Sequence, residues 1–134
     1  MMRFIGPWLL GTSAWCATDP WARTAALDEG AALLEQGCVG HNYYRFYTHA
    51  VEASLLAGDT QRSAQWATAL ESYTRQEPNP WAAFYIDFAR LRCHPPAQLQ
   101  VRAAEALRLL ECAQAAGFAR ETVVLKSLVA PQCV

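Results

Sequence analysis

The chain has 134 residues and a formal net charge of −1 at pH 7, and 53% of its residues are hydrophobic, 11% aromatic and 17% charged. This apolar content excludes intrinsic disorder, and a near-neutral chain without a basic stripe excludes the usual electrostatic footprint of a nucleic-acid-binding protein. The length suits a single domain, which we predict to span residues 1–134.

The first predicted element is an apolar helix over residues 6–17. The run is too short to cross a bilayer, which needs about 20 apolar residues. It imitates a signal peptide only poorly, because Pro7 interrupts it and Trp15 stands where a lipoprotein signal needs a small residue before Cys16. We therefore expect a buried helix in a cytoplasmic protein, with no membrane partner.

Five further helices are predicted from start and stop signals, over residues 20–36, 42–57, 60–75, 80–93 and 97–116. Asp19, Asn42, Asp59 (or Thr60) and Asn79 are expected to cap helix N-termini, and Pro20 and Pro80 suit the first helical position. Gly37 is expected to end the second helix in a left-handed conformation. Residues 121–134 could add a seventh helix that docks on the last pair.

The helices are expected to form three antiparallel pairs. Residues 80–93 carry the clearest amphipathic stripe, with apolar side chains at Trp81, Phe84, Tyr85, Phe88 and Leu91. Since the first helix of each pair begins near residue 6, 41 or 79, the period is roughly 35–38 residues, close to the 34 of a tetratricopeptide repeat (TPR). The prediction is an all-α, TPR-like helical-repeat solenoid with a C-terminal segment.

Three stretches, residues 6–11, 41–52 and 73–81, carry a family resemblance. They resemble the C-terminal TPR-like region of large bacterial class III adenylate/guanylate cyclase proteins that also carry an ATPase domain. The resemblance extends to about residue 120 and implies a helical-repeat module joined to signalling domains. This chain has no phosphate-binding Gly-rich loop followed by Lys-Ser/Thr and no paired metal-binding aspartates, so only the repeat module can be carried over.

Most of the aromatic side chains are expected to lie in the core, and those left on an inner face would anchor a peptide or a flat ligand. Arginines beside them would add polar contacts. The candidate binding residues are Tyr43, Tyr44, Arg45, Tyr47, Tyr73, Arg75, Trp81 and Tyr85, with Arg90 as a further polar contact. In the alternative interpretation these arginines are surface charges, and Arg45 and Arg75 pair with Glu52 or Glu77.

Catalytic and metal chemistry find little support in the sequence. His41, His49 and Glu52 share one face of a predicted helix, but a metal site needs a further ligand cluster, so the histidines are expected to be structural or solvent-exposed. No Gly-x-Ser-x-Gly elbow occurs. The five cysteines include no CxxC pair and are expected to be reduced and mostly buried. We therefore expect no catalytic residues, no metal and no cofactor.

The leading functional hypothesis is a non-catalytic scaffold for protein–protein interaction or regulation in signalling, which binds a protein or peptide partner in the groove between successive first helices. One alternative is a small-molecule sensor with an aromatic-lined pocket around the third to fifth helices. Another is a self-association module that forms a homodimer. The apolar first helix also fits a piece of a longer repeat array, because the end of a solenoid exposes an apolar edge unless it is covered.

Overall fold

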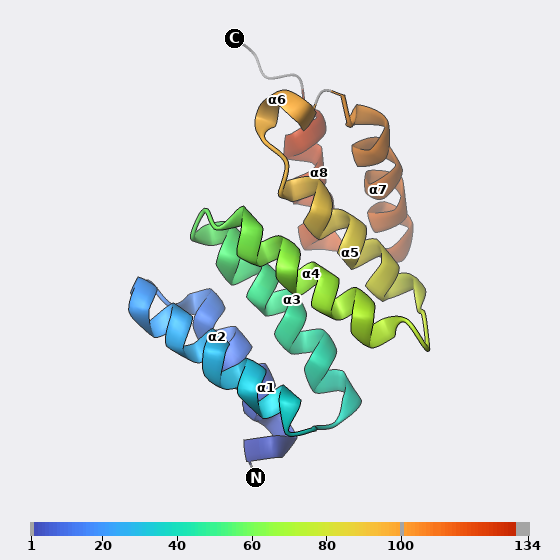
Figure 1. Cartoon of the computed structure of the whole chain (residues 1–134). Coiled ribbons are helices and arrows are strands. Elements are labelled where there is room, and N and C mark those ends of the chain that lie inside the picture. The colour runs from blue at the N-terminus through green and yellow to red at the C-terminus, as the bar shows by residue number, and fades with distance from the viewer. Residues whose placement is uncertain (1, 100, 131–134) are drawn as a thin grey trace.

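The structure is a computed structural model that describes residues 2–99 and 101–130. Over these residues it contains helices and no strand, which confirms the all-α prediction (Figure 1). The helices are α1 (Met2–Cys16), α2 (Pro20–Glu35), α3 (Gly40–Leu56), α4 (Thr60–Thr74), α5 (Pro80–Arg92), α6 (Pro96–Leu99), α7 (Ala103–Ala116) and α8 (Ala119–Val129).

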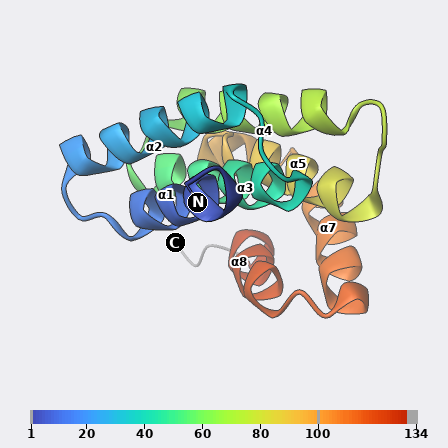
Figure 2. The same cartoon turned by 90° about the horizontal axis from the view of Figure 1, so that it is seen from below.

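The helices are arranged in layers, which are clearest in the view from below (Figure 2). Helices α2 and α4 form an outer layer, and α1, α3 and α5 form an inner layer beside it. Helix α1 packs on both α2 and α3, α3 packs on α4, and α4 packs on α5. Helices α7 and α8 form a hairpin on the open side of the inner layer, where α7 contacts α5. The α7–α8 hairpin therefore faces the side of the inner layer that α2 and α4 do not cover.

The starts of α2, α4 and α5 follow from local sequence, whereas α1 begins at Met2 rather than at residue 6. The side chains of Asp19, Asp59 and Asn79 accept hydrogen bonds of 2.8–2.9 Å from backbone amides in the first turns of α2, α4 and α5, which confirms three predicted caps. Asn42 is not a cap. Helix α3 begins earlier, and the Asn42 amide donates a 2.6 Å hydrogen bond to the carbonyl of Phe4 instead.

The cap at Asn79 provides a measurable test of local stability. Asn79→Ala is expected to lower the free energy of unfolding by about 1–2 kcal/mol, because it removes the cap on α5 and the 3.0 Å hydrogen bond that the Asn79 amide donates to the Tyr44 hydroxyl. Asn79→Asp keeps an oxygen for the cap and should recover most of the loss. Urea denaturation of the two variants measures both values, and equal destabilisation would contradict the capping role.

The C-terminal third differs most from the prediction. The helix expected over residues 97–116 is divided into the short α6 and the longer α7, and α7 begins at Ala103 without a side-chain cap. The buried residues of α7 are Ala106, Leu109 and Ala113, whereas Leu107 is exposed. This face is buried because α7 packs between α5 and α8. The third antiparallel pair therefore consists of α7 and α8, so the expected pairing of residues 80–93 with 97–116 is wrong. The tail does contain a helix, α8, and residues 131–134 lie outside the described part of the chain.

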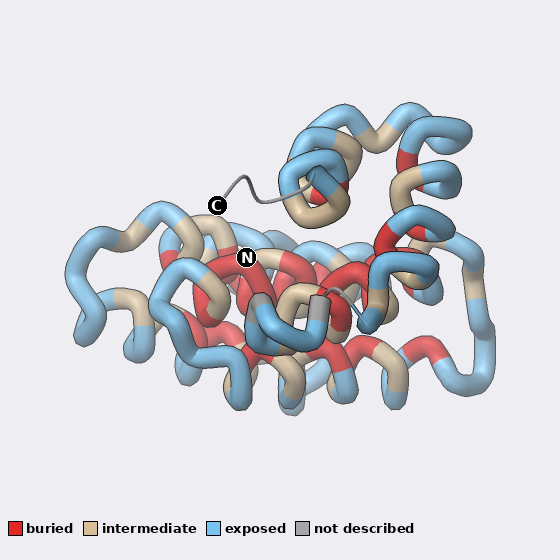
Figure 3. The backbone as a smooth tube through the Cα atoms, turned by 90° about the horizontal axis from the view of Figure 1, so that it is seen from above, coloured by how far each residue is buried: buried red, intermediate tan, exposed pale blue. Residues whose placement is uncertain are grey.

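Two clusters of buried side chains form the core, and the buried positions lie mainly along the inner layer (Figure 3). The larger cluster joins α3, α4, α5, α7 and α8 around Phe88 and Leu109. The smaller cluster joins α1, α2 and α3 around Phe46. Tyr47 and Trp66 pack against both clusters, so side chains of α3 and α4 connect the two halves of the core.

Two expectations about burial are wrong. Helix α1 is only half-buried, because Phe4 and Leu9 on its outer face are 63% and 54% exposed. Cys16 and Cys112 are exposed rather than buried, and Cys133 lies outside the described residues. No helix in the described part of the chain is long and apolar enough to cross a membrane.

Candidate functional site

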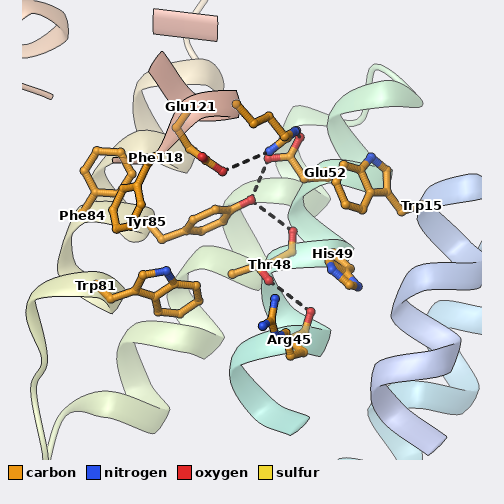
Figure 4. Close-up of a pocket in the computed structure, with 11 residues that line it drawn as sticks. Trp15, Arg45, Thr48, His49, Glu52, Trp81, Phe84, Tyr85, Phe118 and Glu121 are labelled. Carbon is orange, nitrogen blue, oxygen red and sulfur yellow. Dashed lines mark hydrogen bonds and ion pairs between the residues drawn. The ribbon is translucent and has the colours of Figure 1, made fainter. Parts of the chain in front are cut away.

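The inner layer and the first turn of α8 enclose a cavity of about 200 Å³ (Figure 4). Helices α1, α3 and α5 form its walls, and α8 covers it from the side on which the α7–α8 hairpin lies. The lining combines aromatic rings with charged groups: Trp15, Arg45, Thr48, His49, Glu52, Trp81, Phe84, Tyr85, Phe118, Arg120 and Glu121.

Glu52 of α3 is the most heavily bonded group in this cavity. Its carboxylate accepts a 2.7 Å hydrogen bond from the Tyr85 hydroxyl and a two-point contact of 2.6 and 3.0 Å from the Arg92 guanidinium. Arg120 of α8 donates a further hydrogen bond of 2.5 Å. The Glu52 side chain is only 3% exposed, so this carboxylate links α3, α5 and α8 from a buried position.

These contacts determine the ionisation of the site. Burial alone would raise the pKa of Glu52, but the hydrogen bonds from Arg92, Arg120 and Tyr85 and the charge of Arg92 outweigh burial and lower this pKa. Burial and the adjacent Glu52 carboxylate raise the pKa of Tyr85 well above its ordinary value. Glu52 therefore stays ionised and Tyr85 stays protonated at neutral pH, and their hydrogen bond links α3 to α5.

His49 lies one turn before Glu52 and faces α1. Its Nδ1 atom is 3.1 Å from the Thr12 hydroxyl, and its ring centroid is 5.1 Å from that of Trp15. Burial lowers the pKa of His49, and the nearby Arg45 and Arg120 lower it further. The Arg120 guanidinium also lies 4.8 Å from the centroid of the Trp15 ring, which places a cation over an aromatic face.

A second opening of about 360 Å³ continues the cavity along α3, where it is lined by His41, Tyr44, Arg45, Asn79 and Trp81. Arg45 and Trp81 line both spaces, so the two spaces adjoin along α3, and we call them together the inner groove. Arg45 lies 5.4 Å from the Trp8 ring centroid and forms no ion pair with a carboxylate of the described residues. The pairing of Arg45 with Glu52 that the sequence suggested is wrong, because Arg92 and Arg120 occupy that carboxylate.

The structure brings four of the eight candidate binding residues to the inner groove. Tyr44, Arg45 and Trp81 line it directly, and the Tyr44 and Trp81 rings meet edge to face at 5.6 Å. Tyr85 is buried in its wall beside Glu52. These residues come from α3 and α5, the two inner-layer helices on which the prediction had concentrated.

The other four candidates lie outside the lining. Tyr43 stacks on Tyr73 with ring centroids 4.2 Å apart, and its hydroxyl donates a 3.0 Å hydrogen bond to a backbone carbonyl of α2. Tyr47 packs between the two core clusters. Arg75 lines a separate hollow of about 540 Å³ between α4 and α5, together with Arg90, whose guanidinium is held by Glu71.

Sequence reasoning missed several lining residues, most of them distant in the chain from the aromatic-rich centre. Trp15 of α1, Phe118 directly before α8 and Arg120 of α8 reach the groove only through tertiary packing. Thr48 could have been found, because it shares the α3 face on which His41, His49 and Glu52 had already been placed. In the described residues, no group of three or more histidine, cysteine, aspartate or glutamate side chains could hold a metal ion.

The comparisons with known proteins identify no relative. No protein-family model matches the sequence, and no curated protein or solved structure is significantly similar to it.

Proposed function

We propose that this chain is a non-catalytic, TPR-like helical-repeat scaffold that binds an extended segment of a partner protein in the inner groove. One observation carries the proposal: helices α1, α3 and α5, which alternate with the outer-layer helices, line the inner groove with aromatic side chains. Stacked helix pairs in repeat proteins create such concave binding surfaces from their alternate helices. The role in signalling follows from the family resemblance, and the cytoplasmic location follows from the poor match to a signal peptide; both belong to the same proposal.

The lining of the groove supports a peptide as the ligand. Trp81 is half-buried, so it offers an aromatic surface without having to reorganise the core. Arg45 and His41 stand at the open end, where backbone carbonyls or acidic groups of a segment could meet them. Large aromatic side chains and arginines are the residue types that dominate binding energy at protein interfaces.

The proposal is tested by selecting a displayed random-peptide library against the purified chain and measuring the affinity of the recovered peptides. Trp81→Ala is expected to weaken binding about 10-fold or more, because it truncates a central aromatic contact. Trp21→Ala is the matched control, since Trp21 is 79% exposed and lies outside the groove lining. Circular dichroism verifies that both variants remain folded. Equal losses of binding in the two variants would refute the proposal.

A small-molecule sensor is the second candidate, favoured by the cover that α8 places over the 200 Å³ cavity. Ligand pockets for drug-sized molecules usually measure about 300–1,000 Å³, so a ligand would also need the adjoining opening of about 360 Å³. Native mass spectrometry of the freshly purified chain separates the two functions. A bare mass supports the scaffold, whereas added mass from a bound molecule supports the sensor.

Self-association is favoured by a different surface. Phe4, Ile5, Trp8 and Leu9 form an exposed apolar face on α1, and the same native mass spectrum would report a dimer. This surface lies at the edge of the repeat stack, where an uncovered apolar face is expected to attract a neighbouring helix.

A further inference from the structure

The first turn of α8 occupies the inner groove through two side chains. The Phe118 ring, directly before α8, packs on Phe84 with centroids 5.1 Å apart. Two residues further on, Arg120 reaches Glu52 and lies over Trp15. The remainder of α8 packs against α7, and Leu125 is fully buried. The helix is therefore held by its hairpin partner, while its first turn is available to contact the groove.

The contacts of this first turn can be broken without leaving a buried charge unpaired. Glu52 retains the Tyr85 hydroxyl and both bonds from Arg92 when Arg120 leaves. Arg92 is 16% exposed and belongs to the wall, whereas Arg120 is 40% exposed and can regain water where it stands. The cost of separating a buried ion pair arises mainly from an uncompensated charge, and here the buried carboxylate remains compensated.

We propose that the first turn of α8 is an intramolecular occupant of the inner groove, and that the external segment which displaces it carries the same two groups, an aromatic residue followed two positions later by an arginine. This inference rests on the proposed function, since it specifies the partner segment that the groove recognises. The aromatic side chain fits against Phe84, and the guanidinium fits between the Trp15 ring and the Glu52 carboxylate.

Tethering makes α8 a strong competitor. A segment attached to its own site by a short connection acts at an effective concentration in the millimolar range. A free peptide that binds with micromolar affinity to an empty groove is therefore largely excluded while the first turn of α8 is in place. The affinity of the intact chain for its partner is reduced by the small fraction of molecules in which the groove is open.

The experiment adds the first turn of α8 to the protein as a separate peptide. A fluorescein-labelled peptide with the sequence of residues 117–125 is titrated by fluorescence anisotropy against the wild-type chain and against Phe118→Ala/Arg120→Ala, which empties the groove. Arg108→Ala/Val123→Ala is the matched control, because it truncates one arginine and one apolar side chain that do not line the inner groove. Arg120→Ala alone replaces the double variant if the latter does not fold.

The peptide is expected to bind the emptied variant at least 10-fold more tightly than the wild type or the control. A peptide with alanine in place of its arginine should lose that advantage. Equal binding to all three proteins, or no effect of the arginine, would overturn the inference. The proposed function is judged separately. If library-selected peptides still bind and depend on Trp81, only the inference is refuted, and if no peptide binds even the emptied variant, both are refuted.

Discussion

Replacing Glu52 with alanine is expected to lower the free energy of unfolding by about 3–5 kcal/mol, because removal of one partner leaves the other charge of a buried pair unsatisfied. The guanidinium of Arg92 is only 16% exposed, and the Tyr85 hydroxyl points at the same carboxylate from a buried ring. Both groups would lose their shared acceptor together. Chemical denaturation followed by circular dichroism measures the change.

Glu71→Ala is the matched control for this prediction. Glu71 also receives a two-point contact from an arginine, Arg90, but both side chains are more than 40% exposed. Exposed ion pairs contribute about 0–1 kcal/mol, so this variant should be nearly as stable as the wild type. A loss of similar size in the two variants would show that burial does not determine the importance of Glu52.

The same carboxylate gives the prediction a pH dependence with a definite sign. The pKa of Glu52 is lower in the folded chain than the ordinary value of 4.5, so the unfolded chain binds more protons as the pH falls below that value. The stability contributed by Glu52 is therefore fully present above about pH 4.5 and is lost as the pH falls through the folded-state pKa. The difference in free energy of unfolding between the wild type and Glu52→Ala should become smaller as the pH falls. A difference that does not change with pH would contradict the lowered pKa of Glu52.

Gly30→Ala is expected to destabilise the chain by about 2 kcal/mol, although alanine is intrinsically better than glycine in a helix by roughly 0.5–1 kcal/mol. A Cβ atom at Gly30 would lie 2.1 Å from one atom of the Phe46 ring and 2.9 Å from two others. Phe46 is fully buried between α1, α2 and α3, so its ring cannot move aside freely. Thermal denaturation of the variant measures the loss.

A double-mutant cycle with Phe46→Leu tests the steric cause. Leucine has no ring, so Gly30→Ala should cost less in the Phe46→Leu chain than in the wild type, with a coupling of roughly 0.5–3 kcal/mol. Ala32→Gly at an exposed position of α2 measures the intrinsic cost of glycine in this helix. Additive effects of the two core substitutions would rule out the close approach of α2 and α3 at Gly30 as the cause.

Local sequence was sufficient for the starts of α2, α4 and α5 because capping is a short-range interaction. Asp19, Asp59 and Asn79 each accept a hydrogen bond from the residue three positions later, so the signal and its partner lie in the same turn. Asn42 looked equivalent, but its amide bonds to Phe4, 38 residues away. A hydrogen bond between residues so far apart cannot be recognised from the local sequence. The start of α3 was therefore predicted at residue 42 instead of Gly40.

The candidate site was predictable only in part, for the same reason. The aromatic residues of α3 and α5 could be recognised by their spacing, and Tyr44, Arg45, Trp81 and Tyr85 do lie at the inner groove or in its wall. The partners of Glu52 could not be recognised from the sequence, because Arg92 and Arg120 are 40 and 68 residues away from it. Helical periodicity identifies a face, but it does not identify the residue on a distant helix that the face meets.

Helix α3 contributes Val51 to the larger core cluster and Phe46, Ala50 and Ala53 to the smaller one. Cooperativity depends on the interfaces between the packed parts of a chain. A helix shared by two such interfaces couples the folding of both, so partial unfolding that includes α3 spreads in both directions. Fraying that starts at α1 or α8 can instead remain local. Binding in the inner groove along α3 would therefore stabilise the whole chain rather than one end of it.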